Sequence, residues 1–192
     1  MTLGDLKKKT LALIEEINPN VTGLTDDPDI EAKLPYVINQ ILYELARFKK
    51  IPAYQEEEVT KDQIYDLTTL GRDLDADEPD TRNLFYQLDI IRNVEYEYLD
   101  STHVRFLDDG TALFKYFKYP IHIDLDTADS TELDLSDDAL EIAPYGIAAD
   151  VLKADVSNQY GAIYERRYRE MIQTLDSRYS LGSVEFDGGL EI

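Results

Sequence analysis

The sequence predicts an α+β protein in which a helical bundle, built from both chain ends, carries an inserted small antiparallel β-rich module. Three observations predict this fold class. Apolar residues recur at helical spacing near both ends, β-forming residues concentrate in residues 90–125, and acidic stretches at 56–80 and 124–141 flank that part. We expect three parts: residues 1–53 and 135–180 as the bundle, 54–134 as the insertion, and 181–192 as a C-terminal tail.

Two helices are predicted in the N-terminal part. The apolar spacing indicates a first helix over residues 3–18, with Thr2 as its N-cap. Asp27 as N-cap and Pro28 at the first helical position begin the second helix. Its apolar stripe spans five turns and comprises Ile30, Leu34, Ile38, Ile41, Leu42, Leu45 and Phe48. We expect a kink at Pro35, whose ring displaces a helical hydrogen bond.

The middle of the chain predicts strands. Val94, Tyr96 and Tyr98 alternate with glutamates, which indicates a half-buried strand. The Asp108-Asp109-Gly110 turn between two β-rich runs predicts a hairpin, because such a pair accepts the positive φ angles of tight turns. Residues 120–125 predict a further strand, and residues 65–70 are expected to join the same sheet.

Helices resume after the insertion. They are expected to begin at Ser136, to be interrupted at Pro144 and to continue from Tyr145. A last helix is expected to begin near Ser157. Its stripe at Tyr164, Tyr168 and Ile172 should pack against the stripe at Ile38, Ile41 and Leu45, because neither can remain in water.

Composition excludes several function classes. The 19 Lys and Arg residues against 40 Asp and Glu give a formal charge of −21, which repels phosphate backbones and anionic lipids. The absence of cysteine excludes disulfides, thiolate nucleophiles and most structural zinc sites. No run approaches the ~18 apolar residues of a membrane span, so we expect neither export nor insertion.

Two acidic segments resemble calcium loops incompletely. Asp73, Asp75 and Asp77 have the alternating oxygens, but Glu78 stands where the tight turn needs glycine and Leu84 where a bidentate glutamate is needed. The second segment comprises Asp124, Asp126 and Asp129 and also lacks the glycine. Solvated acidic loops explain both better than calcium sites do.

Two further pairs resemble catalytic groups. Glu95 and Glu97 share one strand face, which is more simply the wet side of a sheet. His103 and His122 would share a site only if their strands pair, and no nucleophile motif or glycine-rich phosphate loop accompanies them. We therefore expect no catalytic, cofactor or metal site.

The number and clustering of aromatic residues indicate a protein that binds other protein chains. The chain has 14 tyrosines and 6 phenylalanines, and a small sheet cannot bury both faces of a run containing so many of them. We therefore place Phe114, Tyr116, Phe117 and Tyr119 in a subunit interface, although a local core would account for about half of the clustered rings.

The last helix carries a basic patch at Arg166, Arg167 and Arg169. In so acidic a protein its expected partner is an acidic surface, such as an acidic segment of another copy, and an ordinary solvated face explains it equally well.

The tail has apolar residues at Val184, Phe186, Leu190 and Ile192, separated by Gly188-Gly189. Disordered ends are usually polar, so we expect this segment to dock on a neighbour by adding a strand or by filling pockets.

Three stretches of the helical ends are similar in order and spacing to one known family. They are residues 1–7, residues 38–47 closing on Lys50-Ile51-Pro52-Ala53, and residues 143–155 followed by Tyr164-Glu165-Arg166-Arg167-Tyr168. Over this half of the chain the sequence resembles the head-tail adaptor (connector, or head-completion) proteins of tailed bacteriophages.

The resemblance implies a structural protein of the virion neck, made in the host cytoplasm, without catalysis or cofactor. It implies a ring of about twelve copies below the portal, contacts with the portal protein and with a downstream neck or tail protein, and no membrane. DNA would pass through the ring without specific binding, since an acidic wall repels phosphate. The central sheet is like that of the larger adaptors rather than the all-helical ones.

Two other functions stay open. A tail-completion or tail-terminator protein would form a ring of about half as many subunits. A small acidic metal-dependent enzyme would use the acidic loops, and binding of a divalent ion would raise its melting temperature.

Overall fold

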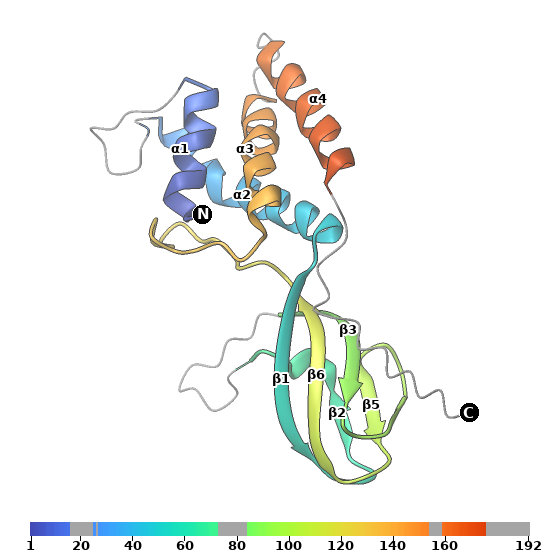
Figure 1. Cartoon of the computed structure of the whole chain (residues 1–192). Helices are drawn as coiled ribbons and strands as arrows, with labels where there is room; N and C mark the ends of the chain where they lie inside the picture. The colour runs from blue at the N-terminus through green and yellow to red at the C-terminus, as the bar shows by residue number, and fades with distance from the viewer. Residues whose placement is uncertain (16–24, 26, 73–83, 154–158, 176–192) are drawn as a thin grey trace.

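The computed structural model describes residues 1–15, 25, 27–72, 84–153 and 159–175, and shows a helical module above a β-module (Figure 1). The helices are α1 (Leu3–Leu13), α2 (Pro28–Phe48), α3 (Asp137–Leu152) and α4 (Gln159–Thr174). The strands are β1 (Ile51–Val59), β2 (Ile64–Asp66), β3 (Phe85–Arg92), β4 (Tyr96–Tyr98), β5 (His103–Phe106) and β6 (Gly110–Lys118), with a 3₁₀ turn, η1, at Leu67–Thr69. This is the expected α+β fold, with the β-module inserted between helices from both chain ends.

The helices begin at the predicted caps. Thr2 and Asp5 form a capping box at the start of α1, and Asp27 accepts hydrogen bonds from two backbone amides of α2. Ser136 occupies the N-cap position of α3. The first helix ends at Leu13 instead of reaching residue 18, and none of the described helices is long and apolar enough to cross a bilayer.

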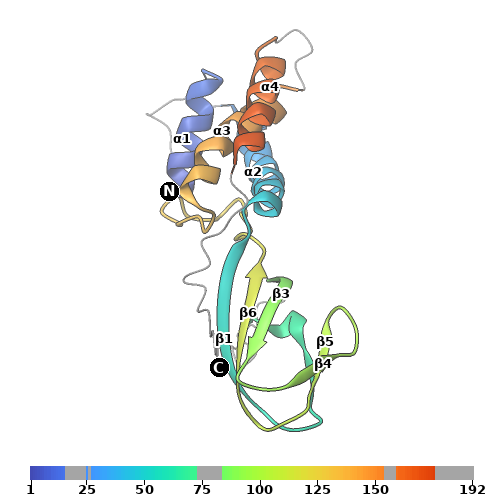
Figure 2. The same cartoon turned by 45° about the vertical axis from the view of Figure 1, so that its right-hand side comes forward.

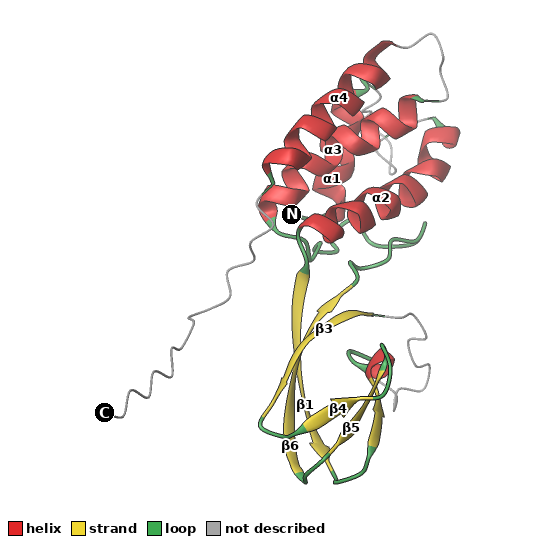
Figure 3. Cartoon of the chain, turned by 90° about the vertical axis from the view of Figure 1, so that its right-hand side faces the viewer, coloured by secondary structure: helices red, strands yellow, loops and turns green. Residues whose placement is uncertain are grey.

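Helix α3 is the centre of the helical module and contacts α1, α2 and α4 (Figure 3). It is buried on most of its circumference and continues through Pro144, so the predicted interruption there is wrong. Pro35 likewise lies inside a continuous α2. Ile38, Ile41 and Leu45 share one core with Tyr168 and Ile172, which confirms the expected packing of the two chain ends.

The β-module consists of two three-stranded antiparallel sheets that pack face to face, and each strand of one sheet is followed or preceded in the chain by a strand of the other. One sheet has the strand order β1-β6-β3 and the other β2-β5-β4. The connections β1–β2, β3–β4 and β5–β6 all cross between the two sheets at the end far from the helical module (Figure 2). Side chains from both sheets meet in a second core that includes Ile91, Phe106 and Phe114. The module thus has a core of its own.

Two residues with left-handed backbone conformation lie where the chain bends from one sheet to the other. Asp62 has a φ of 64° in the connection from β1 to β2, and Asn93 has a φ of 73° in that from β3 to β4. Hydrogen bonding continues across the bend, where the amide of Asp62 donates to the carbonyl of Phe106. The predicted hairpin around Gly110 is wrong in pairing: β5 and β6 flank the turn but lie in different sheets.

Residues 119–135 belong with the helical module instead of the insertion. Ile123, Leu133 and Leu135 lie in the helical core. The side chain of Asn39 in α2 binds Ile123 twice: its Nδ2 donates to the carbonyl at 2.7 Å and its Oδ1 accepts from the amide at 2.8 Å. The backbone groups of Ile123 are therefore satisfied by a side chain, and the predicted strand at 120–125 is replaced by an extended loop. The β-module ends at Lys118, not at residue 134.

Strand β1 has no counterpart in the prediction. It follows α2 after only two residues, and Ile51 lies in the helical core while Val59 lies in the β core. Its paired neighbour β6 returns to the helical module, so two adjacent strands connect the modules.

Candidate functional site

The inner face of the β1-β6-β3 sheet holds two of the four aromatic residues predicted for an interface. Phe114 is fully buried and Tyr116 is 4% exposed, and both pack in the core of the β-module. Burial raises the pKa of the Tyr116 hydroxyl. Phe117 lies on the other face but is covered by Lys50, whose Nζ lies 4.8 Å from the ring centroid. The structure therefore assigns these three rings to the chain's own packing, not to an intersubunit surface.

Tyr119 lies at the junction of the two modules. Its ring is partly buried between Tyr43 of α2, at a centroid distance of 5.5 Å, and Tyr86 of β3, at 5.1 Å. A cavity of about 70 Å³ beside these rings is also lined by Arg47 and Lys118. The aromatic cluster joins the modules from the β3 side and leaves only Tyr86 appreciably exposed.

The outer face of the β1-β6-β3 sheet is exposed and only partly polar. Directly paired residues of antiparallel strands share a face, so the register gives its composition row by row. From the helical module outward, the rows are Pro52–Phe117–Gln87, Tyr54–Lys115–Ile90 and Glu56–Leu113–Arg92. Tyr54 is 63% exposed and Ile90 38%. We call these three rows, with Lys50 above them, the outer face.

The outer face carries charges of both signs. Lys50, Lys115 and Arg92 lie along it with the carboxylate of Glu56, Glu58 follows on the same face of β1, and Asp89 is exposed at the bulge beside Ile90. Lys115 places its Nζ 5.5 Å from the Tyr54 ring centroid, and Lys50 also donates to Gln87 at 2.7 Å. Cations and exposed apolar side chains are thus interleaved on one surface.

The arginines of α4 lie on its exposed side. Arg166 pairs with Glu170, and Arg169 pairs with Glu165, which lowers the pKa of that carboxyl. Arg167 stacks its guanidinium 4.8 Å from the ring of Tyr145. Each arginine therefore has a local partner; glutamates of α4 neutralise Arg166 and Arg169, whereas Arg167 keeps its charge over an aromatic ring.

A groove of about 500 Å³ lies between α2 and α4 over α3. Phe48, 42% exposed, lies at its edge, and Ile172 and Gln173 at the end of α4 line the same groove. Gly146 forms part of its floor, where an added Cβ would lie 2.8 Å from the Tyr168 ring. The end of α4 is thereby fixed beside the end of α2, next to the start of β1.

One polar contact crosses this groove. The hydroxyl of Tyr168 donates to Oε2 of Glu44 at 3.2 Å. Burial, and then the negative charge of Glu44, raise the pKa of this hydroxyl well above its usual range. The tyrosine therefore stays a neutral donor that ties α4 to α2.

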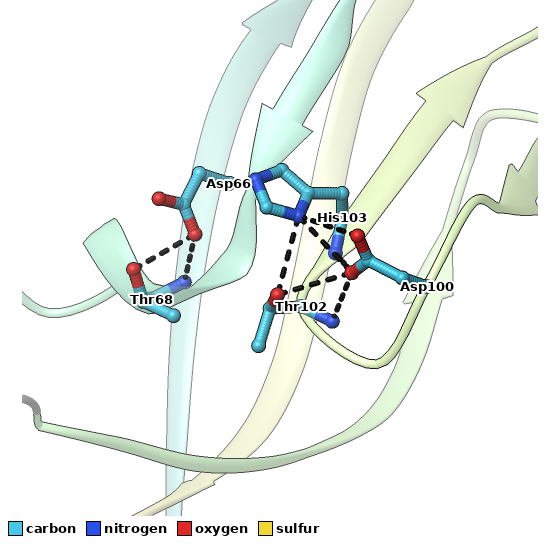
Figure 4. Close-up of polar contacts among 5 residues, drawn as sticks. All are labelled: Asp66, Thr68, Asp100, Thr102 and His103. Atoms are coloured by element: carbon cyan, nitrogen blue, oxygen red, sulfur yellow. Dashed lines mark hydrogen bonds and ion pairs between the residues drawn. The ribbon is translucent and has the colours of Figure 1, made fainter.

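A cluster of hydroxyls and carboxylates surrounds His103 (Figure 4). Both carboxylate oxygens of Asp100 lie 3.0 Å from Nδ1 of His103. Asp100 also accepts from the amides of Thr102, at 2.7 Å, and of His103, at 2.8 Å. The Thr102 amide and then the His103 side chain lower the pKa of Asp100 to about 2.

Asp66, the second aspartate of this cluster, also accepts hydrogen bonds within a turn. Asp66 caps η1 by accepting from the amide and the hydroxyl of Thr68. Burial opposes its ionisation, but these hydrogen bonds outweigh it and lower the pKa of Asp66. The cluster thus stabilises the two turns that lie side by side at one end of the β2–β5 pair, and the hydrogen bonds of its aspartates and threonines are used within these turns.

The other candidate groups are kept apart. His103 lies in β5 and pairs with Asp66, whereas His122 lies in the loop on the helical module near Asp124, so the two histidines do not share a site. Glu97 forms an ion pair with Arg105 across the β4–β5 pair. Asp129 pairs with Lys7 at 2.7 Å. Within the described ranges, no group of three or more His, Cys, Asp or Glu side chains is placed to hold a metal ion.

Two predicted segments lie outside the described residues. They are the incomplete calcium loop that begins at Asp73 and the tail with Val184, Phe186, Leu190 and Ile192.

Comparison with known proteins adds no assignment. No protein-family model matches the chain, and no curated protein matches it significantly. The surfaces described above therefore carry the functional argument.

The outer face is the feature that the sequence did not reveal. The glutamates of β1 resemble a solvated acidic connection, so the sequence predicts no strand there and no exposed face around Tyr54. The sequence of β1 gives no alternation of apolar and polar residues, because Gln55 and Glu57 occupy its inward positions and only Ile51 and Val59 at its ends are buried.

Proposed function

We propose that this chain is a structural head-tail adaptor of a tailed bacteriophage, a subunit of a ring below the portal that extends the DNA channel and links capsid to tail. The observation that carries the proposal is the pairing of two modules, each with its own core, with a sheet face that exposes Tyr54 and Ile90 on an acidic chain. Such a subunit presents distinct surfaces above, below and to its neighbours.

The charge distribution supports a passage for DNA. The chain carries 40 acidic against 19 basic side chains, and in α4 Arg166 and Arg169 are paired with carboxylates. A ring wall of this composition repels phosphate and lets DNA slide instead of binding it. This use of charge needs no catalytic or metal group.

The proposed ring assigns a partner to each surface that the sequence predicts to be a contact. The exposed side of α4, with Arg166, Arg167 and Arg169, faces an acidic part of a neighbouring copy. Residues 181–192 dock on an adjacent subunit or on the portal. Tyr119 supports the junction between the modules and contributes to the ring only through the neighbouring Tyr86.

Symmetry of the assembly tests the proposal. The purified chain, alone and together with the portal protein of the same phage, is imaged by electron microscopy and weighed by native mass spectrometry. We expect a closed ring of about twelve copies on the portal. A ring of about six copies would make the chain a tail terminator, and failure to join the portal or any particle would refute a neck function.

A thermal-shift assay with Ca²⁺, Mg²⁺ and Mn²⁺ tests the enzymatic alternative. A ligand that binds only the folded chain raises its melting temperature. We expect no rise with any of the three ions.

A further inference from the structure

The chain crosses between the helical module and the β-module twice, and the two crossings lie side by side. Helix α2 passes to β1 through Lys49 and Lys50, and β6 passes through Tyr119 to the loop on the helical module. Ile51, the first residue of β1, pairs with Lys118, the last residue of β6. Ile51 also lies in the helical core. The sheet is thus attached to the helical module along one short row.

The packing on either side of this row is separate. The helical core and the β core, as far as the chain is described, have no residue in common. Modules of one chain rotate relative to each other unless the interface between them is large and apolar. The Ile51–Lys118 row is therefore a hinge position, and the angle between the modules depends on the side chains beside it.

Two polar contacts beside the hinge row do not fix an angle. Lys118 pairs with Asp134 at 2.9 Å, and Lys50 donates to Gln87 at 2.7 Å. Polar pairs that remain accessible to water contribute little stability, and a lysine side chain has enough torsion angles to follow a moving partner. These two contacts can persist while the modules rotate.

The aromatic contact beside the hinge row is different. The Tyr119 ring lies 5.5 Å from that of Tyr43 in α2 and 5.1 Å from that of Tyr86 in β3, with interplanar angles of 54° and 65°. Tilted and edge-to-face rings at these distances attract each other. A tyrosine ring has only two side-chain torsion angles, so this contact forms at one angle between the modules. The cavity of about 70 Å³ beside the rings leaves space for them to separate.

We propose that the β-module rotates as a rigid body about the Ile51–Lys118 row, and that the rings of Tyr43, Tyr119 and Tyr86 form a latch that holds it as Figure 3 shows. Strand β1 has nine residues and is about 30 Å long, so a rotation of about 15° moves its far end by about 8 Å. The latch belongs to the single chain and does not depend on the proposed ring.

A distance measurement between the modules tests the latch. The chain has no cysteine, so spin labels can be attached to the introduced pair Tyr36→Cys and Lys61→Cys. Both positions are exposed, one in α2 and the other just beyond β1. Helix α2 lies at an angle to β1, so rotation at the hinge changes the distance between the labels (Figure 1). Double electron–electron resonance should give one narrow distance distribution for this labelled chain.

Removal of either ring should release the β-module. Tyr86→Ala and Tyr119→Ala should each broaden or shift the distribution by about 4–8 Å, because the distance records part of the displacement at the far end of β1. Tyr86→Phe keeps the ring and should keep the narrow distribution. Tyr54→Ala is the matched control, because it removes an exposed tyrosine of the same sheet outside the cluster.

Label pairs within one module test the rigid-body rotation. The pair Tyr36→Cys with Gln173→Cys reports on the helical module, and Lys61→Cys with Leu99→Cys reports on the β-module; all four positions are exposed. Both distributions should stay the same in every variant. Tyr86→Ala removes only the exposed ring of the cluster, so it decides the test if Tyr119→Ala fails to fold.

Three results would overturn the proposal. An inter-module distribution that is equally narrow in both alanine variants would mean that the rings do not hold the angle. A broad distribution with the cluster intact would mean that no latch exists. Equal broadening of a pair within one module would mean that the substitutions loosen that module and do not release a rotation.

Discussion

Replacing Asn39 by alanine should be among the most destabilising single changes in this chain. The side chain is 8% exposed, and its two hydrogen bonds hold the amide and the carbonyl of Ile123, a residue 1% exposed. Alanine leaves both backbone groups buried without a partner. A buried unsatisfied group costs about 1–3 kcal/mol, so the two together predict a loss of about 2–6 kcal/mol in the free energy of unfolding.

Urea denaturation followed by circular dichroism measures this loss, and amide hydrogen exchange locates it. Exchange at Ile123 should accelerate in Asn39→Ala, while exchange within the β-module stays close to that of the unaltered chain. Gln40→Ala is the control, because that neighbouring side chain bonds Asp150 on the surface and its loss should change stability by less than about 0.5 kcal/mol.

The reasoning fails if Asn39→Ala costs less than about 0.5 kcal/mol and the Ile123 amide keeps its protection. That result would mean that residues 119–135 are held by apolar packing alone.

Three further predictions concern packing and pH. Gly146→Ala should destabilise the chain by about 1–2 kcal/mol in urea, because the new Cβ would lie 2.8 Å from the Tyr168 ring and 3.0 Å from Ile41, outweighing the gain of about 1 kcal/mol in helix propensity. Tyr168→Phe should cost about 1 kcal/mol near neutral pH and should flatten the alkaline stability profile; the raised pKa of this tyrosine makes its contribution complete below pH 10.0, its ordinary pKa, and lost above that range, as alkaline melting curves would show. Asp100 has a pKa lowered from 3.8 to about 2, so its contribution is complete above pH 3.8 and lost as the pH falls toward 2; Asp100→Asn should abolish this acid dependence in melting temperatures measured across that window.

Local signals explain what the sequence predicted well. Thr2 and Asp27 mark helix starts because capping depends on a few neighbouring residues. The stripe at Ile38 and Ile41 faces α4 across the central helix because a helix repeats every 3.6 residues whatever its partner is. The insertion of a β-rich module followed from the same periodicities.

Long-range pairing explains what it missed. Which face of β6 is buried depends on its pairing with β1 and β3, so Phe114 was predicted in an interface although it lies in the β core. The bend between the two sheets at Asp62 and Asn93 needs the connections β1–β2, β3–β4 and β5–β6 to lie side by side, and no local sequence pattern predicts that. Asn39 looked like an ordinary polar residue of α2, because its partner is 84 positions away in the chain.

The placement of the β-module between α2 and α3 sets an order of events during synthesis. The central helix α3 is translated about 100 residues after the end of α2, which at 5–20 residues per second leaves the apolar stripe of α2 uncovered for about 5–20 s. Residues 51–118 contain the six strands that the structure describes and the residues of the β core, so this module can fold within that interval. Nascent chains stalled with β6 outside the ribosomal exit tunnel and α3 still inside it should accordingly protect β6 from proteolysis and leave α2 open to cleavage. The helical module therefore completes its core after the β-module, although α2 is synthesised first. The surface that a chaperone would bind on the emerging chain is then the apolar stripe of a helix and not a strand.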